Sequence, residues 1–291
     1  MMTIHAMFDG RDDILRTVSF LPDGAVAVTE SDDETLAALI KDHVPNMDSR
    51  VLKNQPLPPM TFHPVFQELI THAGDYSLDY EETDKGVKVT YQSDDPYVVM
   101  LVQEHAKLVS RFIKNGHDEI HADYELPKFD KAQAAAKSKA ISAKIALFQR
   151  LSGRLKEVMQ AEGPAAAITV CSREAAEIAR TVGEEEGLRI GRTSLKLRNP
   201  ANAAPDWVKP LLESDATVAQ FTMLEDDRLG ALLPIRLQAA CVICHGPTGS
   251  LSDDVRAQLA QHYAYDQATG YREGDLRGWF WVDVPVEPSQ P

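Results

Sequence analysis

The run Cys241-Val242-Ile243-Cys244-His245 is the part of the chain whose residue types and spacing are best suited to chemistry. Two thiols three positions apart on one helical turn can each form a thioether bond with a haem vinyl group, and the adjacent imidazole then faces the iron. The chain has only 3 cysteines and 9 histidines, so chance rarely produces such a run. The pattern predicts covalent attachment of a c-type haem through Cys241 and Cys244, with His245 as an iron ligand.

Two other kinds of site use a C-x-x-C pair. A redox dithiol needs only the two thiols, whereas a structural zinc ion needs four ligands, usually supplied by a second C-x-x-C or H-x-H group. The sequence contains no second group of that kind. A haem site is therefore the preferred interpretation, and the dithiol and the zinc site are the alternatives.

The elements that must position this run lie in residues 128–291, which we predict to be the C-terminal domain. Residues 130–160 are rich in Ala, Lys, Gln and Leu, which predicts a long helix that ends before Gly163-Pro164. A second helix is expected over residues 164–186, capped by Gly187. Further elements are expected as strands over 188–196, 217–224, 230–237 and 279–284 and a helix over 252–263. Helices followed by an antiparallel sheet predict an α+β domain.

Five motifs, in order, give this half a resemblance to a known family. They are Cys171 with Ala175-Ala176-Glu177-Ile178-Ala179, residues 191–200, Leu233-Pro234-Ile235, residues 241–246, and residues 268–278. Through these motifs, residues 130–287 resemble the haem-c-binding domains with a PAS-like fold that occur in bacterial and cyanobacterial periplasmic proteins, often fused to signalling modules. The resemblance implies a PAS-like sensor domain and does not extend to residues 1–127.

The resemblance also implies the roles of the ligands. The two cysteines of the run would hold the haem, His245 would be the proximal ligand, and Cys171 is the candidate distal ligand. Cys171 is also the one thiol that attachment leaves free, and a thiolate is a strong iron ligand that lowers the reduction potential. The other interpretation of Cys171 is a buried helical cysteine that packs as a small apolar residue. Met223 and His262 are alternative distal ligands.

Three basic residues, Arg192, Lys196 and Arg198, follow one another at alternate or every-fourth spacing on the expected strand. Residues at that spacing share one face of a strand. The face would hold the two haem propionates through charge-assisted hydrogen bonds, for which arginine has the best geometry. The alternative is that these three side chains bind no ligand and simply form the solvent-exposed face of a strand.

Residues 1–127 contain an internal duplication. Residues 26–33 recur as residues 87–95 with one insertion, and each copy continues into a Leu-(Ile/Val)-x-x-His sequence. Matches on either side extend the repeat to about 60 residues, so the copies are expected to span about residues 4–54 and 62–115.

Each copy is expected to form a helix, two strands and a second helix. In the first copy, Pro22-Asp23-Gly24 predicts a hairpin turn, and Ser31 or Asp32 predicts the N-cap of the helix that follows. In the second copy, Pro96 is expected in the first helical turn, where its missing N–H has no cost. Two copies side by side predict one four-stranded sheet covered by helices. The predicted fold class is therefore α+β, a duplicated α-β-β-α domain followed by a long helix and a PAS-like antiparallel-sheet domain.

Four histidines, His5, His43, His63 and His105, occupy equivalent places in the two copies. If a pseudo-twofold arrangement brings the four imidazoles together, they would suit a second metal ion, copper or zinc, or a haem held by two histidines without covalent attachment. The preferred alternative is that duplicated histidines pack on duplicated helix faces.

The charge of the chain is unevenly distributed. Its net charge is −14, and residues 1–127 contain 10 Lys+Arg against 23 Asp+Glu, whereas residues 128–291 contain 20 against 21. An acidic surface disfavours nucleic acid and anionic membranes and favours a basic partner or a cation. No stretch approaches the 18 apolar residues that a transmembrane helix needs, so no membrane span is expected.

These observations predict a non-catalytic c-type haem protein that senses redox state or a diatomic gas, or passes electrons to a redox partner or signalling protein. Bacterial c-type haem is normally attached after export, so we expect a periplasmic or otherwise exported protein whose signal peptide has been removed. The alternative is a module that binds a metal ion or a partner through the duplicated domain. A haem peroxidase or reductase is a further alternative, which would need an open or displaceable distal site. The sequence has no nucleophile elbow, phosphate loop or Rossmann fingerprint.

Overall fold

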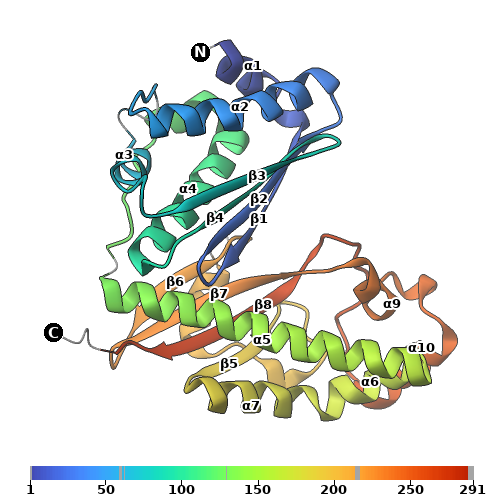
Figure 1. Ribbon diagram of the computed structural model, residues 1–291. Coiled ribbons are helices and arrows are strands. Elements are labelled where there is room, and N and C mark those ends of the chain that lie inside the picture. Colours follow the sequence, from blue (N-terminus) through green and yellow to red (C-terminus); the bar gives the residue numbers. More distant parts are fainter. Residues whose placement is uncertain (1, 59–60, 62, 129, 214–216, 288–291) are drawn as a thin grey trace. The chain divides into compact units, whose positions relative to one another are not determined.

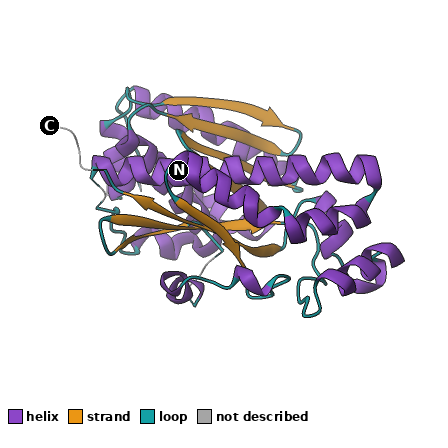
Figure 2. Ribbon diagram, turned by 90° about the horizontal axis from the view of Figure 1, so that it is seen from below, coloured by secondary structure: helices purple, strands orange, loops and turns teal. Residues whose placement is uncertain are grey.

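The computed structural model describes residues 2–58, 61, 63–128, 130–213 and 217–287 (Figure 1). The chain divides into two compact units, Met1–Ser138 and Lys139–Gln290. The described residues form ten α-helices and two four-stranded antiparallel sheets, one sheet in each unit (Figure 2). The predicted α+β class is confirmed, and the predicted domain boundary after residue 127 stays a prediction.

The first unit is built on the sheet β1-β2-β4-β3. Its elements in chain order are α1 (Met2–Asp9), β1 (Ile14–Leu21), β2 (Gly24–Ser31), α2 (Glu34–Leu52), α3 (Pro64–Thr71), β3 (Ser77–Thr83), β4 (Gly86–Gln92) and α4 (Pro96–Asn115). The hairpins β1-β2 and β3-β4 join through the central pair β2-β4, in which Val28 lies opposite Lys88. Each half thus has the order helix, strand, strand, helix, and the duplication itself stays a prediction.

The helix caps of this unit follow local sequence signals. Asp33 caps α2, because its carboxylate accepts a hydrogen bond from the Leu36 N–H at 2.9 Å. The predicted cap at Ser31 or Asp32 is therefore wrong by one or two positions, since the Ser31 hydroxyl instead accepts from the Asp33 N–H. Pro96 stands in the first turn of α4, as predicted.

Apolar side chains from the sheet and the helices form the core of the first unit. Ile14, Val87 and Val89 of the sheet pack with Leu36 and Ile40 of α2. Burying each such side chain contributes roughly 1.5–3 kcal/mol relative to leaving it in water. The face of α2 that carries Leu36 and Ile40 is therefore fixed against the sheet.

The second unit is built on the sheet β5-β8-β7-β6. The long helix α5 (Lys131–Glu162) begins in the first unit and continues into the second. The elements that follow are α6 (Pro164–Arg173), α7 (Ala175–Glu186), β5 (Arg189–Thr193), α8 (Lys209–Leu212), β6 (Gln220–Leu224), β7 (Arg228–Arg236), α9 (Val242–His245), α10 (Asp253–His262) and β8 (Leu276–Pro285). Among the helices of the described residues, none combines the length and the apolar character that crossing a membrane requires.

Two predicted elements of this unit are corrected. The single helix expected over 164–186 is two helices that meet at Glu174, whose carboxylate accepts hydrogen bonds from the Arg154 guanidinium of α5 at 2.8 and 3.2 Å. The strand expected over 188–196 ends at Thr193, because the Ser194 hydroxyl accepts from the Lys196 N–H at 3.0 Å and so makes a turn. The break at Gly163 and the left-handed cap at Gly187 are confirmed.

Candidate functional site

The run 241–245 is helical, as its spacing predicts. Cys241 is the last residue of a 3-10 turn, and α9 follows directly with Cys244 and His245. Gly246 ends this helix, and its N–H donates to the Val242 carbonyl at 2.8 Å. A Cβ at position 246 would lie 2.6 Å from that carbonyl oxygen, so the turn requires glycine here. Both thiols of the run are half-buried and form no disulfide.

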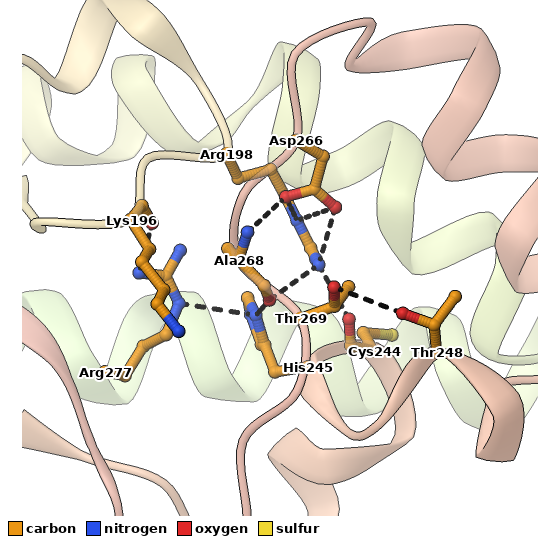
Figure 3. Close-up of polar contacts among 9 residues, drawn as sticks. All are labelled: Lys196, Arg198, Cys244, His245, Thr248, Asp266, Ala268, Thr269 and Arg277. Atoms are coloured by element: carbon orange, nitrogen blue, oxygen red, sulfur yellow. Dashed lines mark hydrogen bonds and ion pairs between the residues drawn. The ribbon is translucent and has the colours of Figure 1, made fainter.

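The His245 ring is held by one of its two nitrogens (Figure 3). Nδ1 lies 2.7 Å from the carbonyl oxygen of Ala268, so its N–H donates to that oxygen and Nε2 carries a free lone pair. The Nε atom of Arg277 lies 3.3 Å from the same Nδ1 and places a positive charge beside the ring. Burial, then the charges of Arg198 and Arg277, lower the pKa of His245 to about 3, so the imidazole is neutral near pH 7.

A loop far along the chain fastens the run through its backbone. The Gly270 N–H donates to the Gly246 carbonyl at 2.9 Å, and the Tyr271 N–H donates to the His245 carbonyl at 3.0 Å. Together with the Ala268 contact, these bonds fix both the backbone and the ring of His245. The motif at residues 268–278 therefore belongs to the same site as the cysteine run.

Arg198 ties this loop to the run from the other side (Figure 3). Its Nη2 donates to the Cys244 carbonyl at 2.7 Å and to the Ala268 carbonyl at 3.2 Å. Its Nε donates to both oxygens of Asp266 at 3.1 and 3.2 Å, and both side chains are about nine-tenths buried, at 8% and 11% exposure. Arg198 therefore braces the backbone around the cysteine run, a structural role that its sequence position alone did not indicate.

The three basic residues do not share a strand face, and that prediction is wrong because β5 ends at Thr193. Arg192 lies on β5 and is half-buried, and among the described residues it makes no hydrogen bond or ion pair. Lys196 is exposed in the turn beyond, with Nζ 5.4 Å from the Tyr271 ring centroid. Their predicted role as propionate ligands stays a prediction.

Cys171 lies on α6, close to the run. Cys244 packs against a cluster that contains Ile168, one helical turn before Cys171 on the same face of α6. Burial raises the pKa of both thiols, that of Cys244 to about 11. The positive charges of Arg192, Arg198 and Arg277 act in the opposite direction at Cys171. The surroundings of Cys171 thus favour its thiolate electrostatically and oppose it by desolvation.

The alternative distal ligands lie in different places. The two ring nitrogens of His262 face hydroxyl groups of α6, Thr169 and Ser172, each at 3.4 Å. On a helix of 3.6 residues per turn, these two residues point to a different side of α6 from Cys171. Met223 is on β6, the edge of the sheet opposite β5, so about three strand spacings, roughly 14 Å, separate it from the β5 edge. Of the three candidates, Cys171 is the one brought next to Cys244.

The four histidines of the first unit lie in different surroundings. Within the part of the chain that the structure describes, no group of three or more His, Cys, Asp or Glu could hold a metal ion. His5 lies against His117, with Nδ1 and Nε2 3.3 Å apart, whereas His63 is buried against aromatic rings, among them Phe66 and Phe112. His43 and His105 lie near each other, since the charge of His43 acts on the pKa of His105. The second metal site of His5, His43, His63 and His105 stays a prediction.

Three residues of the site were given no role from the sequence: Asp266, Ala268 and Arg277. Ala268 and Arg277 both lie within the motif at residues 268–278, and the arginine between Gly274 and Gly278 is a signal that could have been used. Ala268 contributes only its carbonyl oxygen, which any residue has, so its side chain carries no signal. Asp266 could have been found only as a partner for Arg198.

Comparison with known proteins places most of the second unit in one family. The family model named Tll0287-like matches residues 102–285. Among solved structures, the cyanobacterial heme-protein Tll0287 matches with 22% sequence identity and a TM-score of 0.38, over 52% of this chain and 97% of that chain. The search of curated proteins found no match.

Proposed function

This chain belongs to the Tll0287-like family, and from that premise we propose that its second unit binds a c-type haem through Cys241 and Cys244. His245 is the proximal ligand in this proposal, and Cys171 is the distal ligand. The observation that carries it is the contact between His245 Nδ1 and the Ala268 carbonyl, which leaves Nε2 free beside two thiols on one helical turn.

The residues around the run fit such a group. A hydrogen bond from the other ring nitrogen to a backbone carbonyl sets the tautomer of a metal-binding histidine and fixes the plane of its ring. Arg192 and Arg277 form no ion pair within the described residues, so their charges are available to the two propionates. Arg198, by contrast, is already neutralised by Asp266, and we assign it to bracing the loop. When bound, the haem supplies one-electron redox chemistry.

A histidine and cysteine ligand pair favours redox function. A thiolate ligand lowers the reduction potential of haem iron, and a filled distal position does not suit oxygen storage. We therefore assign the unit to low-potential electron transfer or to sensing of redox state, in a PAS-like domain. Sensing of a diatomic gas would require the Cys171 ligand to be displaced, and so would peroxidase or reductase activity.

The proposal includes export. Thioether attachment of haem in bacteria normally follows transport across the membrane, which supports a periplasmic location. Because residues 1–127 carry most of the negative charge, the partner that exchanges electrons or signals with the protein is expected to present a basic surface.

Absorption spectra of protein expressed in a periplasm that matures c-type haem test the attachment. The wild type should show a Soret band that stays with the chain on acid-acetone extraction, and Cys241→Ala/Cys244→Ala should lose its haem to the solvent. Extraction of haem from the wild type, or the absence of a Soret band, would contradict covalent attachment.

Cys171→Ala tests the distal ligand and leaves attachment intact. The wild type is expected to be six-coordinate and low-spin, and the variant to lose that state and bind carbon monoxide readily, with the haem still covalently held. His262→Gln is the matched control, because His262 is the other candidate on the α6 side, and its spectrum should match the wild type. An unchanged spectrum in Cys171→Ala would contradict the assignment.

A further inference from the structure

The first unit encloses a cavity that the haem proposal does not use. Its volume is about 210 Å³, and it lies between the sheet and the helices of this unit. Its wall is mostly aliphatic and aromatic, with side chains such as Met7, Ile40, Val89 and Val109. An engineered cavity of roughly 150 Å³ with such a lining holds benzene, so this one has space for an apolar group of about ten carbon atoms.

Two arginines line this apolar space, and neither has a counter-ion among the described residues: Arg16, and Arg11, whose Nη1 donates to the Phe8 carbonyl at 3.1 Å. Arg16, on β1, donates from Nη1 to the Thr29 hydroxyl at 2.5 Å and from Nε to the Ser110 hydroxyl at 3.3 Å. Among the described residues it forms no ion pair. Burial lowers the pKa of Arg16 to about 10, so the guanidinium remains charged near pH 7. A buried charge held only by neutral groups is costly unless an anion accompanies it.

The other polar groups of the wall are mainly hydrogen-bonding partners. Burial lowers the pKa of His43 to about 4 and of His105 to about 3, so both imidazoles are neutral. The buried Nδ1 of His105 and the buried Nε of Arg11 have no hydrogen-bond partner in the described part of the chain. Nδ1 of His105 can donate or accept one bond to a guest, and the Nε–H of Arg11 can donate one.

The wall contains one carboxylate, Asp48, and no ion pair joins it to Arg16 within the described residues. Burial raises the pKa of Asp48, and its charge acts on Tyr76 and Tyr91, which also line the cavity. Tyr91 is also affected by the charge of Arg16, so both charged groups act on this one ring. The Arg16 charge nevertheless has no ion pair among the described residues.

We propose that this cavity binds a small apolar carboxylic acid, with its carboxylate on Arg16 and its hydrocarbon or aromatic body against the aliphatic wall. The planar guanidinium matches a carboxylate in geometry as well as charge, and the neutral histidines add hydrogen bonds without repelling it. The site is independent of the haem and of its ligands.

Calorimetric titration of the haem-loaded full chain with three probes of one shape tests the proposal. The probes are 2-naphthoate, the neutral 2-naphthalenemethanol and the cationic 2-naphthylmethylammonium. We expect 2-naphthoate to bind at least about tenfold more tightly than the alcohol, and the ammonium compound to give no measurable heat. The Soret band should not change, because no residue of the cavity wall belongs to the unit that carries the proposed iron ligands.

Substitutions of residues that line the cavity test whether the probes bind inside it. Arg16→Met should abolish the preference for 2-naphthoate over the alcohol, and Arg16→Lys should retain it because the charge remains. Val109→Phe should weaken both probes by filling the cavity. Arg50→Met, a change of the same type on α2 outside the cavity wall, is the matched control and should bind as the wild type does.

Three results would overturn the proposal. The first is no measurable binding of any probe to the wild type. The second is equal affinity for 2-naphthoate and the alcohol, or a preference that survives in Arg16→Met. The third is unchanged binding in Val109→Phe, which would place the probe on the surface. If Arg16→Met does not fold, Val109→Phe and the three probes still decide the outcome.

Discussion

His245 in the second unit and His105 in the first are alike in titration and different in geometry. Burial lowers the pKa of each to about 3, so both rings are neutral near pH 7. Nδ1 of His245 donates to the Ala268 carbonyl at 2.7 Å, whereas Nδ1 of His105 is buried with no partner among the described residues. A depressed pKa therefore does not distinguish the proposed iron ligand from a buried histidine of the core, whereas the hydrogen bond at Nδ1 does distinguish these two rings.

The arginines of the two units repeat this contrast. Arg198 is buried with Asp266, and the pair braces a loop around the cysteine run. Arg16 is held by two hydroxyl groups and has no carboxylate in the described residues. A buried cation that is paired with a carboxylate stabilises the structure around it. A buried cation without such a partner can instead be stabilised by an anionic ligand.

The largest expected effect separates the two histidines. His245→Ala should abolish the low-spin spectrum and reduce the yield of haem-loaded protein by about tenfold or more, since a ligand and its fixed ring are lost. His105→Gln should leave the haem spectrum unchanged. Absorption spectra and haem content per chain measure the effect of both substitutions. A loss of the low-spin spectrum in His105→Gln would contradict the distinction between the two histidines.

The next effect separates the two arginines. Asp266→Asn leaves Arg198 buried and unpaired, which should reduce the free energy of unfolding by about 3 kcal/mol. Arg16→Met should change it by about 1 kcal/mol or less, because it removes an unpaired charge. Urea unfolding followed by tryptophan fluorescence reports on the second unit, which contains all 3 tryptophans, and circular dichroism reports on both. Equal losses in the two variants would contradict the distinction.

Protonation of the buried histidines of the first unit is expected to reduce the free energy of unfolding as the pH falls, by less than Asp266→Asn reduces it. The pKa of His105 is lowered from 6.5 to about 3, so below pH 6.5 the unfolded chain binds a proton that the folded chain does not. The stability contribution is complete above pH 6.5 and is lost as the pH falls, by about 1 kcal/mol between pH 6 and pH 5.

His43 adds a contribution of the same sign, since burial lowers its pKa to about 4. His105→Gln should therefore remove about half of the decrease that the two histidines cause between pH 6 and pH 5. Urea midpoints at both pH values measure it. A variant as pH-sensitive as the wild type would show that His105 does not titrate in this way.

The smallest effect concerns the exposed cation. Lys196→Gln removes a charge that lies over the Tyr271 ring at the surface, so the free energy of unfolding should fall by only about 0.5 kcal/mol. The haem spectrum should remain that of the wild type. If Lys196→Gln reduced the free energy of unfolding as much as Asp266→Asn does, the difference in exposure between Lys196 and Arg198 would not determine their contributions to stability.

Helix starts and ends that depend on a single proline or glycine were predicted correctly from the sequence. Pro96 at the start of α4, Gly163 between two helices and Gly187 after α7 each act through their own backbone, so the sequence reveals them directly. The end of β5 depends on Ser194, whose hydroxyl also donates to the Arg277 carbonyl 83 residues further on. A contact of that kind has no local sequence pattern, which is why the strand was predicted too long.

The candidate site also contains some groups that have a local sequence signal and others that have none. The cysteines of the run were identified by type and spacing, because thioether chemistry needs particular side chains. The groups that hold His245 come from Ala268 and Arg277, 23 and 32 residues away, and one of them is a backbone carbonyl. In the first unit, equivalent positions in the two copies predict that four histidines meet, but no local pattern reveals that aromatic rings surround His63.

The backbone bonds between residues 245–246 and 270–271 also determine when the site can close. A chain made from its N-terminus releases Cys241 and Cys244 before the segment that will fasten them, since Arg277 follows His245 by 32 residues. Until residues 268–277 dock, the two thiols lie on a turn that lacks the backbone bonds of Gly270 and Tyr271. Docking of this last segment is therefore the folding step after which the run is fixed.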